Sequence, residues 1–314
     1  MTGISNVFVW YISLISYCNL LQCIMMIVNE RHILMRTLLL ALLLAASLLL
    51  WIPYYIYTID DSDYLQVHFL DVGQGDAIFI QTPDGVEVLI DGGVNNTVLR
   101  ELAAQMSFFD RSIDMIIGTH PDSDHIGGLV DVLERYQVGT ILRTENTGNS
   151  ATWQSYTNAV EDEDTKVLYA HAGQVFHLGS EVLLRVLYPV HDTTGLNSNA
   201  SSIILQVVYG EAEFLLTGDS PKRIEEYLVK DGTYLESDVL KVGHHGSRTS
   251  TSEIFLEAVS PQYAVISAGA DNRYGHPHLE VTDSLFNYGA KIVSTVTEGT
   301  ISFESDGKTV WQKK

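Results

Sequence analysis

Two histidines and two aspartates lie within six residues in the segment THPDSDHIGG, residues 119–128. The segment follows the apolar run IDMIIG and ends in a pair of glycines. Imidazole nitrogens and carboxylate oxygens that converge from one strand end are suitable ligands for a divalent ion in the zinc or manganese class. The alternative is a polar loop in which Asp124 caps the helix that HIGGLVDVLERY predicts.

Other apolar runs also stop at residues with ligand chemistry. FLLTGDS stops at Asp219, LKVGHHGS at His244 and His245, and VLIDGG at Asp91. Each run alone is weak evidence, because an aspartate also starts helices and makes turns. Active sites of α/β sheets collect at strand ends, so the joint occurrence favours one common site. In DVGQGD, Asp76 and the two glycines before it are predicted to shape a tight turn.

From residue 63 onward, strand-like and helix-like segments alternate without a low-complexity linker, which predicts one α/β domain of about 250 residues. Helices are predicted at residues 96–106, with Asn96 as the N-cap, and at 125–136, 153–163, 221–232 and 278–290. Strands are predicted at residues 64–72, 76–82, 86–93, 113–120, 138–144, 181–189, 201–209, 212–219 and 238–243, with a closing hairpin.

Two uncharged apolar stretches precede this domain. Residues 4–28 and residues 37–57 are each long enough to cross roughly 30 Å of hydrocarbon as a helix. The second stretch is the stronger candidate, because it starts after Arg36 and ends in Trp51 and three tyrosines that suit a membrane interface. We expect one or two transmembrane helices in residues 1–57 and a domain in residues 58–314. Residues 1–34 could instead be an upstream extension, since Met35 resembles a natural start.

Charge is distributed unevenly along the chain. The net charge is −21, and because the residues before Asp60 sum to +1, the remainder carries about −22. Such a surface repels polyanions at long range. Positive residues stay on the cytoplasmic side of a membrane, so Arg31 and Arg36 predict that the acidic domain lies outside the cytoplasm. We expect the anchor to remain uncleaved. Cys18 and Cys23 both lie in the apolar region, so the domain has no disulfide partner and no thiolate ligand.

The motif set resembles a known family. HFLDVGQGDAIFI, LIDGG, THPDSDHIGG, FLLTGD, LKVGHHGSRTSTS and NRYGHPH are similar to the metallo-β-lactamase fold, and specifically to the hydrolase domain that ends ComEC-type competence proteins. The resemblance covers residues 63–312 in order, and it implies a four-layer αββα sandwich. The long multi-span region of the competence proteins is missing, so the chain resembles the hydrolase domain alone on a membrane tether.

The resemblance implies two divalent metal ions, Zn or Mn. The family signature His-x-His-x-Asp-His falls on His120, Asp122, Asp124 and His125, with Asp122 in place of the middle histidine. His120 and Asp122 would serve the first ion, Asp124 and His125 the second, and Asp219 would bridge them. The exchange to Asp122 makes the ligand set harder, which tilts the preference towards manganese.

Further ligand positions follow from the same resemblance. The histidine of the next family motif falls on His245, while His244 would orient its neighbour or bind metal itself. The histidine that many members carry before the bridging aspartate has no clear counterpart. Asn199 in NSNASSIIL occupies that place, either as a poor oxygen ligand or beside an open first site. Asp91 is a further candidate for a ligand or for a partner of one.

Two ions about 3.5–4 Å apart, bridged by Asp219 and a water, would generate hydroxide near neutral pH and clamp a phosphoryl or acyl centre. Asp124 is the residue best placed to orient that hydroxide. His276 in NRYGHPH is the candidate proton donor to the leaving group, with His278 second. Both could alternatively belong to a surface turn around Pro277.

Substrate contacts are expected from the loop HHGSRTSTS. Ser247 and Thr249 could hold phosphate oxygens together with Arg248, the one positive charge nearby, and His278 could add a contact. A solvated loop charge is an equally good interpretation of Arg248.

Three functions agree with these features: a phosphodiesterase or nuclease, a hydrolase of a lactam, lactone or thioester, and a non-catalytic binding module facing outside. The presence of both Asp124 and Asp219 counts against the third, and resemblance to the competence branch favours the first. The charge of about −22 argues against long DNA unless metal ions and Arg248 reverse the local field. We therefore expect phosphodiester hydrolysis, with DNA possible and the substrate's size open. The sequence does not indicate an oligomeric state.

Overall fold

The structure is a computed structural model that describes residues 22, 25, 32–52 and 63–313. The chain divides into two compact units, Met1–Asp60 and Asp61–Lys314. The first apolar stretch, the tyrosines that follow Trp51 and both cysteines lie outside the described residues, so the predictions that concern them stay predictions.

In the described part of the first unit, one helix, His32–Ile52, is long and apolar enough to cross a membrane. Its 21 residues span about 30 Å at 1.5 Å per residue, and none of its side chains is buried by protein. The helix overlaps the predicted span at residues 37–57. The length and composition of this helix agree with membrane association.

Within the described residues, the second unit contains a sheet of eight strands, here sheet A, in the order β15-β14-β1-β2-β3-β4-β5-β6. The strands β3 to β6 run parallel, whereas β1, β2, β14 and β15 pair antiparallel. The bounds are β1 Leu65–Phe69, β2 Ile78–Gln81, β3 Glu87–Ile90, β4 Ser112–Gly118, β5 Gln137–Arg143, β6 Lys166–Tyr169, β14 Ile301–Ser305 and β15 Val310–Gln312.

The same part of the chain forms a second sheet, sheet B, in the order β13-β12-β11-β10-β9-β8-β7. The strands β10 to β13 run parallel, and β7 to β10 pair antiparallel. The bounds are β7 Val175–Leu178, β8 Val182–Tyr188, β9 Ile204–Tyr209, β10 Ala212–Leu216, β11 Val239–Lys241, β12 Tyr263–Ile266 and β13 Lys291–Ser294.

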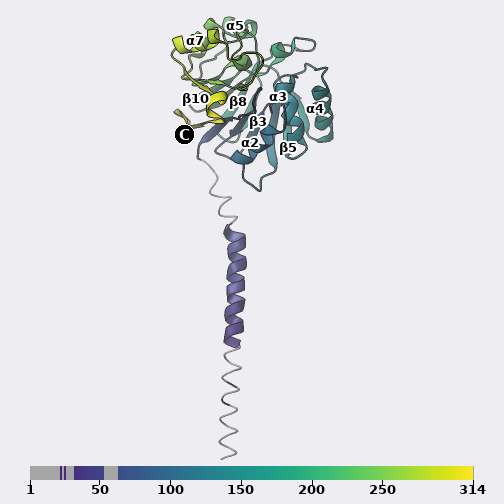
Figure 1. Ribbon diagram of the computed structural model, residues 1–314, viewed down its shortest axis with the longest axis vertical. Coiled ribbons are helices and arrows are strands. Elements are labelled where there is room, and N and C mark those ends of the chain that lie inside the picture. Colours follow the sequence, from purple (N-terminus) through teal and green to yellow (C-terminus); the bar gives the residue numbers. More distant parts are fainter. Residues whose placement is uncertain (1–21, 23–24, 26–31, 53–62, 314) are drawn as a thin grey trace, which may run out of the picture. The chain divides into compact units, whose positions relative to one another are not determined.

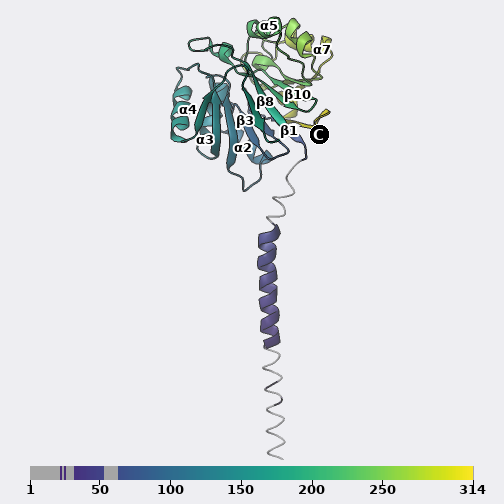
Figure 2. The same ribbon diagram turned by 180° about the vertical axis from the view of Figure 1, so that it is seen from behind.

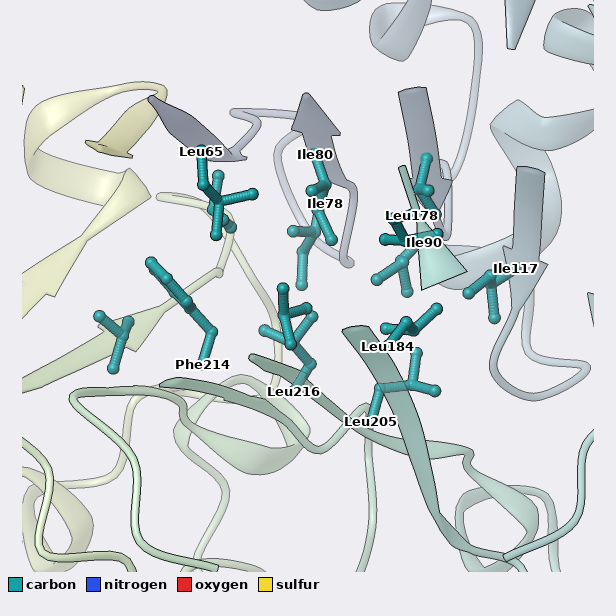
Figure 3. Packing of buried hydrophobic residues seen from close by; sticks show 14 of the residues in the cluster. Leu65, Ile78, Ile80, Ile90, Ile117, Leu178, Leu184, Leu205, Phe214 and Leu216 are labelled. Atoms are coloured by element: carbon teal, nitrogen blue, oxygen red, sulfur yellow. The ribbon is translucent and has the colours of Figure 1, made fainter. Parts of the chain in front are cut away.

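The two sheets pack face to face through alternating apolar residues. Ile78 and Ile80 of β2 point towards Phe214 and Leu216 of β10, as Figure 3 shows, and belong to the central core. The residue between them, Phe79, points to the opposite face and belongs to an outer core. Successive side chains of a strand point to opposite faces of the sheet, so apolar residues at alternate positions give each sheet an inner and an outer apolar face.

Helices cover the outer face of each sheet. The cores contain residues of α2, α3 and α4 against sheet A and of α5, α6 and α7 against sheet B. Figures 1 and 2 show α3 and α4 on one side of the domain and α5 and α7 on the other. The four-layer αββα sandwich is confirmed. The helix bounds are α2 Thr97–Gln105, α3 Ser123–Leu133, α4 Ala151–Asp162, α5 Lys222–Asp231, α6 Glu253–Val259, α7 Leu279–Asn287 and α8 Thr295–Glu298.

Asn96 is the N-cap residue of α2 as predicted, but the cap hydrogen bonds differ from those expected. The Asn96 side chain makes no cap hydrogen bond. The side chain of Asn95 instead accepts hydrogen bonds from the backbone and hydroxyl of Thr97. Asp124 does not cap α3 either, because the N-cap residue is Asp122 and Asp124 lies in the first turn. The short strands β6 and β7 were not predicted, since both are sheet edges whose side chains are mostly half-buried or exposed.

The parallel strands bring their carboxyl ends to one edge of the sandwich. In sheet A, Ile90 of β3 lies opposite Ile117 of β4. In sheet B, Leu216 of β10 lies opposite Lys241 of β11. The backbone N–H of Ile203 donates to the carbonyl of Thr119 at 3.1 Å, which joins the chain before β9 to the loop after β4. The polar residues that follow β3, β4, β10 and β11 therefore share one location.

The buried Glu225 supports the loop between β11 and α6, which carries His244 and His245. The carboxylate of Glu225 in α5 accepts hydrogen bonds from the backbone N–H of Thr251 at 2.7 Å and of Ser252 at 2.8 Å, where α6 begins. Burial raises the pKa of Glu225 from 4.5 to about 7, although these hydrogen bonds act in the opposite direction.

We expect Glu225→Gln to flatten the pH dependence of stability. Because the pKa of Glu225 is raised in the folded state, its contribution to the free energy of unfolding is full below pH 4.5 and is lost as pH rises towards 7. Denaturant unfolding of the full chain in detergent between pH 4.5 and 8 measures this slope. The more exposed neighbour Glu226 provides the control, Glu226→Gln, which should keep the wild-type slope. An equal slope in Glu225→Gln and wild type would contradict the expectation.

Candidate metal centre

Side chains from both sheets meet at the shared edge. His120, Asp124 and His125 follow β4, Asp219 follows β10, and His245 follows β11. The Nε2 atom of His125 lies 3.3 Å from Asp219 Oδ1, and Nε2 of His245 lies 3.5 Å from both Asp219 Oδ2 and Asp124 Oδ2. All except Asp124 are almost completely buried. The structure therefore brings five of the predicted ligands together.

The hydrogen bonds of the three imidazoles define which nitrogen is free. His125 Nδ1 lies 2.7 Å from a carboxylate oxygen of Asp91, and His245 Nδ1 lies 2.9 Å from the carbonyl of Ser267. Both partners only accept, so each Nδ1 must carry the proton. His120 Nδ1 lies 3.0 Å from the hydroxyl of Thr119, which itself donates to Asp91, so this Nδ1 donates as well. Each neutral ring therefore presents a lone pair on Nε2.

These lone pairs have no protein partner. The Nε2 atoms of His120, His125 and His245 and the Oδ1 atom of Asp219 are all buried without a hydrogen bond. Buried acceptors without a partner are unfavourable, and here they converge, as they do around a cation. The donor atoms of His120, His125 and Asp219 form one group within 4.8 Å, and those of Asp124, His125 and His245 form another. The donor set fits a divalent metal ion.

The spacing of several donors agrees with metal coordination. Donors about 2.1 Å from one zinc ion at tetrahedral angles are roughly 3.4 Å apart. His125 Nε2 lies 3.3 Å from Asp219 Oδ1, and His245 Nε2 lies 3.5 Å from Asp124 Oδ2 and from Asp219 Oδ2. These three contacts have the spacing of neighbouring ligands of a metal ion.

The donors assigned to the other ion are more open. His120 Nε2 lies 3.6 Å from Asp122 Oδ2, and the Asp122 side chain is 43% exposed. His244 Nε2 lies 3.7 Å from Asp219 Oδ2, so His244 also faces Asp219. The amide nitrogen of Asn199 is 3.4 Å from both ring nitrogens of His244. The structure thus places His244 beside the first site, with Asn199 against its ring, and their roles stay predictions.

Electrostatics keep the carboxylates charged. Burial alone would raise the pKa of Asp219, but His245 and His125 hold this pKa well below its usual range. Burial alone would lower the pKa of His245, but Asp219 and Asp76 raise it to about 9. Without a metal ion, His245 therefore favours the protonated form, whose positive charge stabilises the carboxylates, and its Nε2 lone pair becomes free only when an ion replaces that proton. Metal ligands must be deprotonated, so a divalent ion would compete with protons on these histidines.

The backbone is strained at His244 and His245, in the loop HHGS that follows β11. His244 and His245 have φ values of 50° and 56°, in the left-handed region that costs about 1–3 kcal/mol for such residues. The backbone N–H of His244 donates to the carbonyl of Gly218, and the Ser250 hydroxyl donates to the carbonyl of Gly243 at 2.6 Å. These bonds hold both rings towards Asp219.

Glycine is required where neighbouring loops touch this cluster. At Gly75, φ is +119° and a Cβ atom would lie 2.0 Å from the backbone oxygen of Asp124. At Gly246, φ is +81° and a Cβ atom would lie 2.6 Å from Cβ of Pro277. The two contacts fix the loops 71–77 and 272–278 beside the candidate centre.

The predicted proton donor lies next to the cluster. The ring centroid of His276 is 5.4 Å from that of His244 and 6.3 Å from that of His245, and it stacks on Tyr274. Burial and the imidazoles of His244 and His245 lower the pKa of His276 to about 4. His276 is therefore neutral at pH 7, and its assignment as a proton donor stays a prediction.

The predicted substrate contacts lie on the same loops. The hydroxyls of Ser247 and Thr249 are 3.0 Å apart, and Thr249 also lies 3.0 Å from His244 Nδ1, so both are engaged around His244. The Arg248 side chain is 59% exposed and lies 3.9 Å from Glu280. The backbone N–H of Arg248 donates to His278 Nδ1 at 3.2 Å. The substrate roles of these residues are not tested by the structure.

Two residues of the cluster were missed. Asp76 was interpreted as a turn residue, and the turn is present, but its side chain is buried within 3.4 Å of His245 Nδ1. Lys241, the last residue of β11, is completely buried and pairs with Asp76. A lysine inside the apolar run DVLKVG, just before two histidines, was the available signal. The partner could not be identified, because it lies 165 residues away.

Comparison with known proteins decides the family. Residues 70–270 match the family model described as the metallo-β-lactamase superfamily. The chain belongs to the metallo-β-lactamase superfamily. It is 30% identical over 255 residues to ComE operon protein 3 of Bacillus subtilis (strain 168), which covers 76% of this chain and 33% of that protein. It is 33% identical over 235 residues to competence protein ComA of Neisseria gonorrhoeae, covering 74% and 31%.

A third relative of this metallo-β-lactamase-fold chain is recombination protein 2 of Haemophilus influenzae, 30% identical over 241 residues, covering 75% of this chain and 28% of that protein. The chain thus spans about a third of the length of these relatives. Among solved structures, the metallo-β-lactamase fold protein YhfI of Bacillus subtilis matches with a TM-score of 0.50 at 11% identity, over 75% of this chain and 98% of that chain. That likeness shows the fold alone. The resemblance inferred from the motifs is confirmed.

We expect Asp219→Ala to lose metal at both groups of donors. The loss should exceed the roughly 10–100-fold decrease in affinity that follows removal of a ligand's hydrogen-bond partner, because Asp219 contacts His125 and His245 directly. Elemental analysis after reconstitution with zinc or manganese measures the bound ions. His276→Ala is the control and should keep the metal of the wild type. Two ions still bound to Asp219→Ala would remove the bridging assignment.

Proposed function

We propose that this chain is a membrane-tethered, metal-dependent phosphodiesterase that acts outside the cytoplasm. One observation carries the proposal: three buried Nε2 atoms and one Asp219 oxygen lack a partner, and they belong to two overlapping groups of donors that share His125. The superfamily consists generally of metal-dependent hydrolases, and this donor set suits that chemistry. The relatives are named ComE operon protein 3, competence protein ComA and recombination protein 2, which supports a phosphodiester, with DNA possible, over a carbonyl substrate.

Two divalent ions, zinc or manganese, would be held at the centre. Asp124, His125 and His245 would bind one ion, His120 and Asp122 the other, with Asp219 contributing to both. The carboxylates at each group favour hard ions, which is why manganese is an alternative to zinc. When bound, the ions would supply Lewis-acid activation of water and polarise the phosphoryl oxygens.

The protein side chains would position the reacting groups. Asp124 is ionised and partly exposed, so its carboxylate can accept a hydrogen bond and orient an attacking water. The neutral ring of His276 can donate an N–H to the oxygen that leaves. Arg248 is exposed and only weakly paired, so its guanidinium is available to a phosphate oxygen.

The acidic surface bears on the size of the substrate. The domain carries about −22 net charge, and Arg248 and Arg273 are the cations on the loops 243–250 and 272–278. Long polyanions are repelled by such a surface, whereas a small diester needs only the metal centre. The same charge is the observation that favours a second candidate, a hydrolase of an uncharged lactam, lactone or thioester.

We expect weak DNA binding whose salt dependence is shallower than that of a protein that contacts many phosphates. The logarithm of affinity should fall with the logarithm of salt concentration with a slope no steeper than about −2, because each neutralised phosphate of a single strand contributes about −0.7. A small chromogenic phosphodiester should be hydrolysed with almost no salt dependence, and a chromogenic lactam should not be hydrolysed. Fluorescence anisotropy with single-stranded DNA and absorbance assays on the full chain in detergent measure these quantities.

A slope of about −5 or steeper would show a basic groove and overturn the preference for a small diester. Turnover of the lactam alone would replace the phosphodiesterase by the second candidate. His276→Ala serves as the control in both assays, because it should keep its metal while turnover falls by about 10²–10⁴-fold.

We expect the catalytic domain to face away from the cytoplasm. Arg31 precedes the helix His32–Ile52 in the sequence and Arg36 lies near its amino-terminal end, and positive residues at the end of a span stay on the cytoplasmic side. Protease added to intact cells, or to spheroplasts where an outer membrane is present, should degrade the domain, while a cytoplasmic marker protein stays intact. Protection of the domain until the cells are lysed would reverse the topology.

A further inference from the structure

Lys241 places a positive charge inside the domain, at the end of β11. Its side chain is completely buried. The ammonium forms a close ion pair with Asp76 and also lies 3.2 Å from the carbonyl oxygen of Gly218 and 3.9 Å from Oδ1 of Asp219. A buried ammonium is costly unless it is paired, and here it has oxygen partners from three residues.

Asp76 connects this lysine to loops of the other sheet. Its backbone N–H donates to the carbonyl of Asp124 at 3.2 Å, and its own carbonyl accepts from Gly93 at 2.8 Å. Its carboxylate pairs with Lys241 through one oxygen, while the other oxygen lies 3.4 Å from His245 Nδ1. The ion pair therefore joins sheet A to sheet B directly behind the candidate metal ligands.

The position of the ammonium is one that a metal ion could take. Asp76, Asp219 and His245 offer donor atoms that all lie within 4.8 Å of one another. Lys241 contacts two of these residues and the Gly218 carbonyl, an oxygen-rich set that also suits a hard divalent ion. The ammonium and a metal ion would compete for the same carboxylates.

Charge at the centre balances only when Lys241 is counted. The cluster in the described residues contains five aspartates, at positions 76, 91, 122, 124 and 219. With neutral histidines, the two divalent ions of the proposed function supply four positive charges against five negative ones. Lys241 supplies the fifth. Three of the five, Asp76, Asp91 and Asp219, are buried, and a buried charge without compensation is strongly unfavourable.

We propose that Lys241 is a positioning residue that acts as a built-in third cation. It holds Asp76 and Asp219 in place and excludes metal from the Asp76 side, so that the two ions occupy the side that faces His120 and Asp124. The inference rests on the proposed two-ion centre but not on the identity of the substrate.

The test counts bound ions rather than turnover. Lys241→Ala removes the ammonium and opens space beside Asp76, so the full chain in detergent should bind one more Mn²⁺ than the wild type. Lys241→Met fills the space without a charge and should bind no additional ion. In Lys241→Ala combined with Asp76→Asn, the count should return to that of the wild type. Elemental analysis and electron paramagnetic resonance with Mn²⁺ alone measure these numbers.

Lys291→Ala is the matched control, because Lys291 lies in the same sheet but is exposed and contacts Gln312. It should bind as many ions as the wild type. An unchanged ion count in folded Lys241→Ala would overturn the proposal and leave Lys241 with a purely structural role. A wild type that binds a single ion would refute the two-ion centre, while a gain of one ion in Lys241→Ala would still support the exclusion of metal by Lys241.

Should Lys241→Ala fail to fold by circular dichroism, Asp76→Asn tests the same idea. The ammonium then keeps only Asp219 as an ionic partner and draws it from the ions, so Mn²⁺ affinity should fall about 10–100-fold. Unchanged affinity in folded Asp76→Asn would overturn the proposal.

Discussion

The concentration of buried carboxylates between the two sheets is the constraint on which the centre depends. An ionised carboxylate removed from water costs several kcal/mol unless a partner compensates it. The fold provides such partners almost everywhere: His125 and Thr119 bind Asp91, and Lys241 binds Asp76. Among the buried atoms of the described residues that lack a hydrogen-bond partner are Nε2 of His120, His125 and His245 and Oδ1 of Asp219, and these residues belong to overlapping groups of possible metal donors. The distribution of unsatisfied groups therefore outlines the position of a cation.

The sandwich makes this arrangement because parallel strands of both sheets end at one edge. Loops after β3 and β4 contribute from sheet A, and loops after β10 and β11 contribute from sheet B. Contacts such as Gly75 against the Asp124 carbonyl leave no space for side chains at the crossing points. The left-handed backbone of His244 and His245 is tolerated because neighbouring hydrogen bonds hold it. The same sandwich therefore both positions these loops and holds the strained backbone at the candidate centre.

Membrane association and acidity set the conditions under which the centre would meet a substrate. A helix long enough to cross the bilayer precedes the domain in the chain, so the proposed enzyme would act on substrates that reach a membrane surface. The net charge of the domain opposes long polyanions, and Arg248 is an exposed positive charge on a loop of the candidate centre. A substrate of the proposed enzyme would therefore approach a predominantly negative surface.

The sequence alone identified an α/β domain and the apolar helix, and it predicted that His120, Asp124, His125, Asp219 and His245 lie in one cluster. The helix and the strands are local features, an uncharged apolar run and an apolar period of two, whereas the αββα arrangement and the expected ligand roles came from the resemblance of the motifs to the family. Sequence reasoning failed where the outcome depends on packing, as in the edge strands β6 and β7. The pairing of Lys241 with Asp76 is also a tertiary result, because the two residues are 165 positions apart and meet only when the sheets pack together. Only the tertiary structure could decide which imidazole nitrogens are free, since the hydrogen bonds that fix each tautomer come from residues such as Asp91 and Ser267, distant in the chain from the rings they orient.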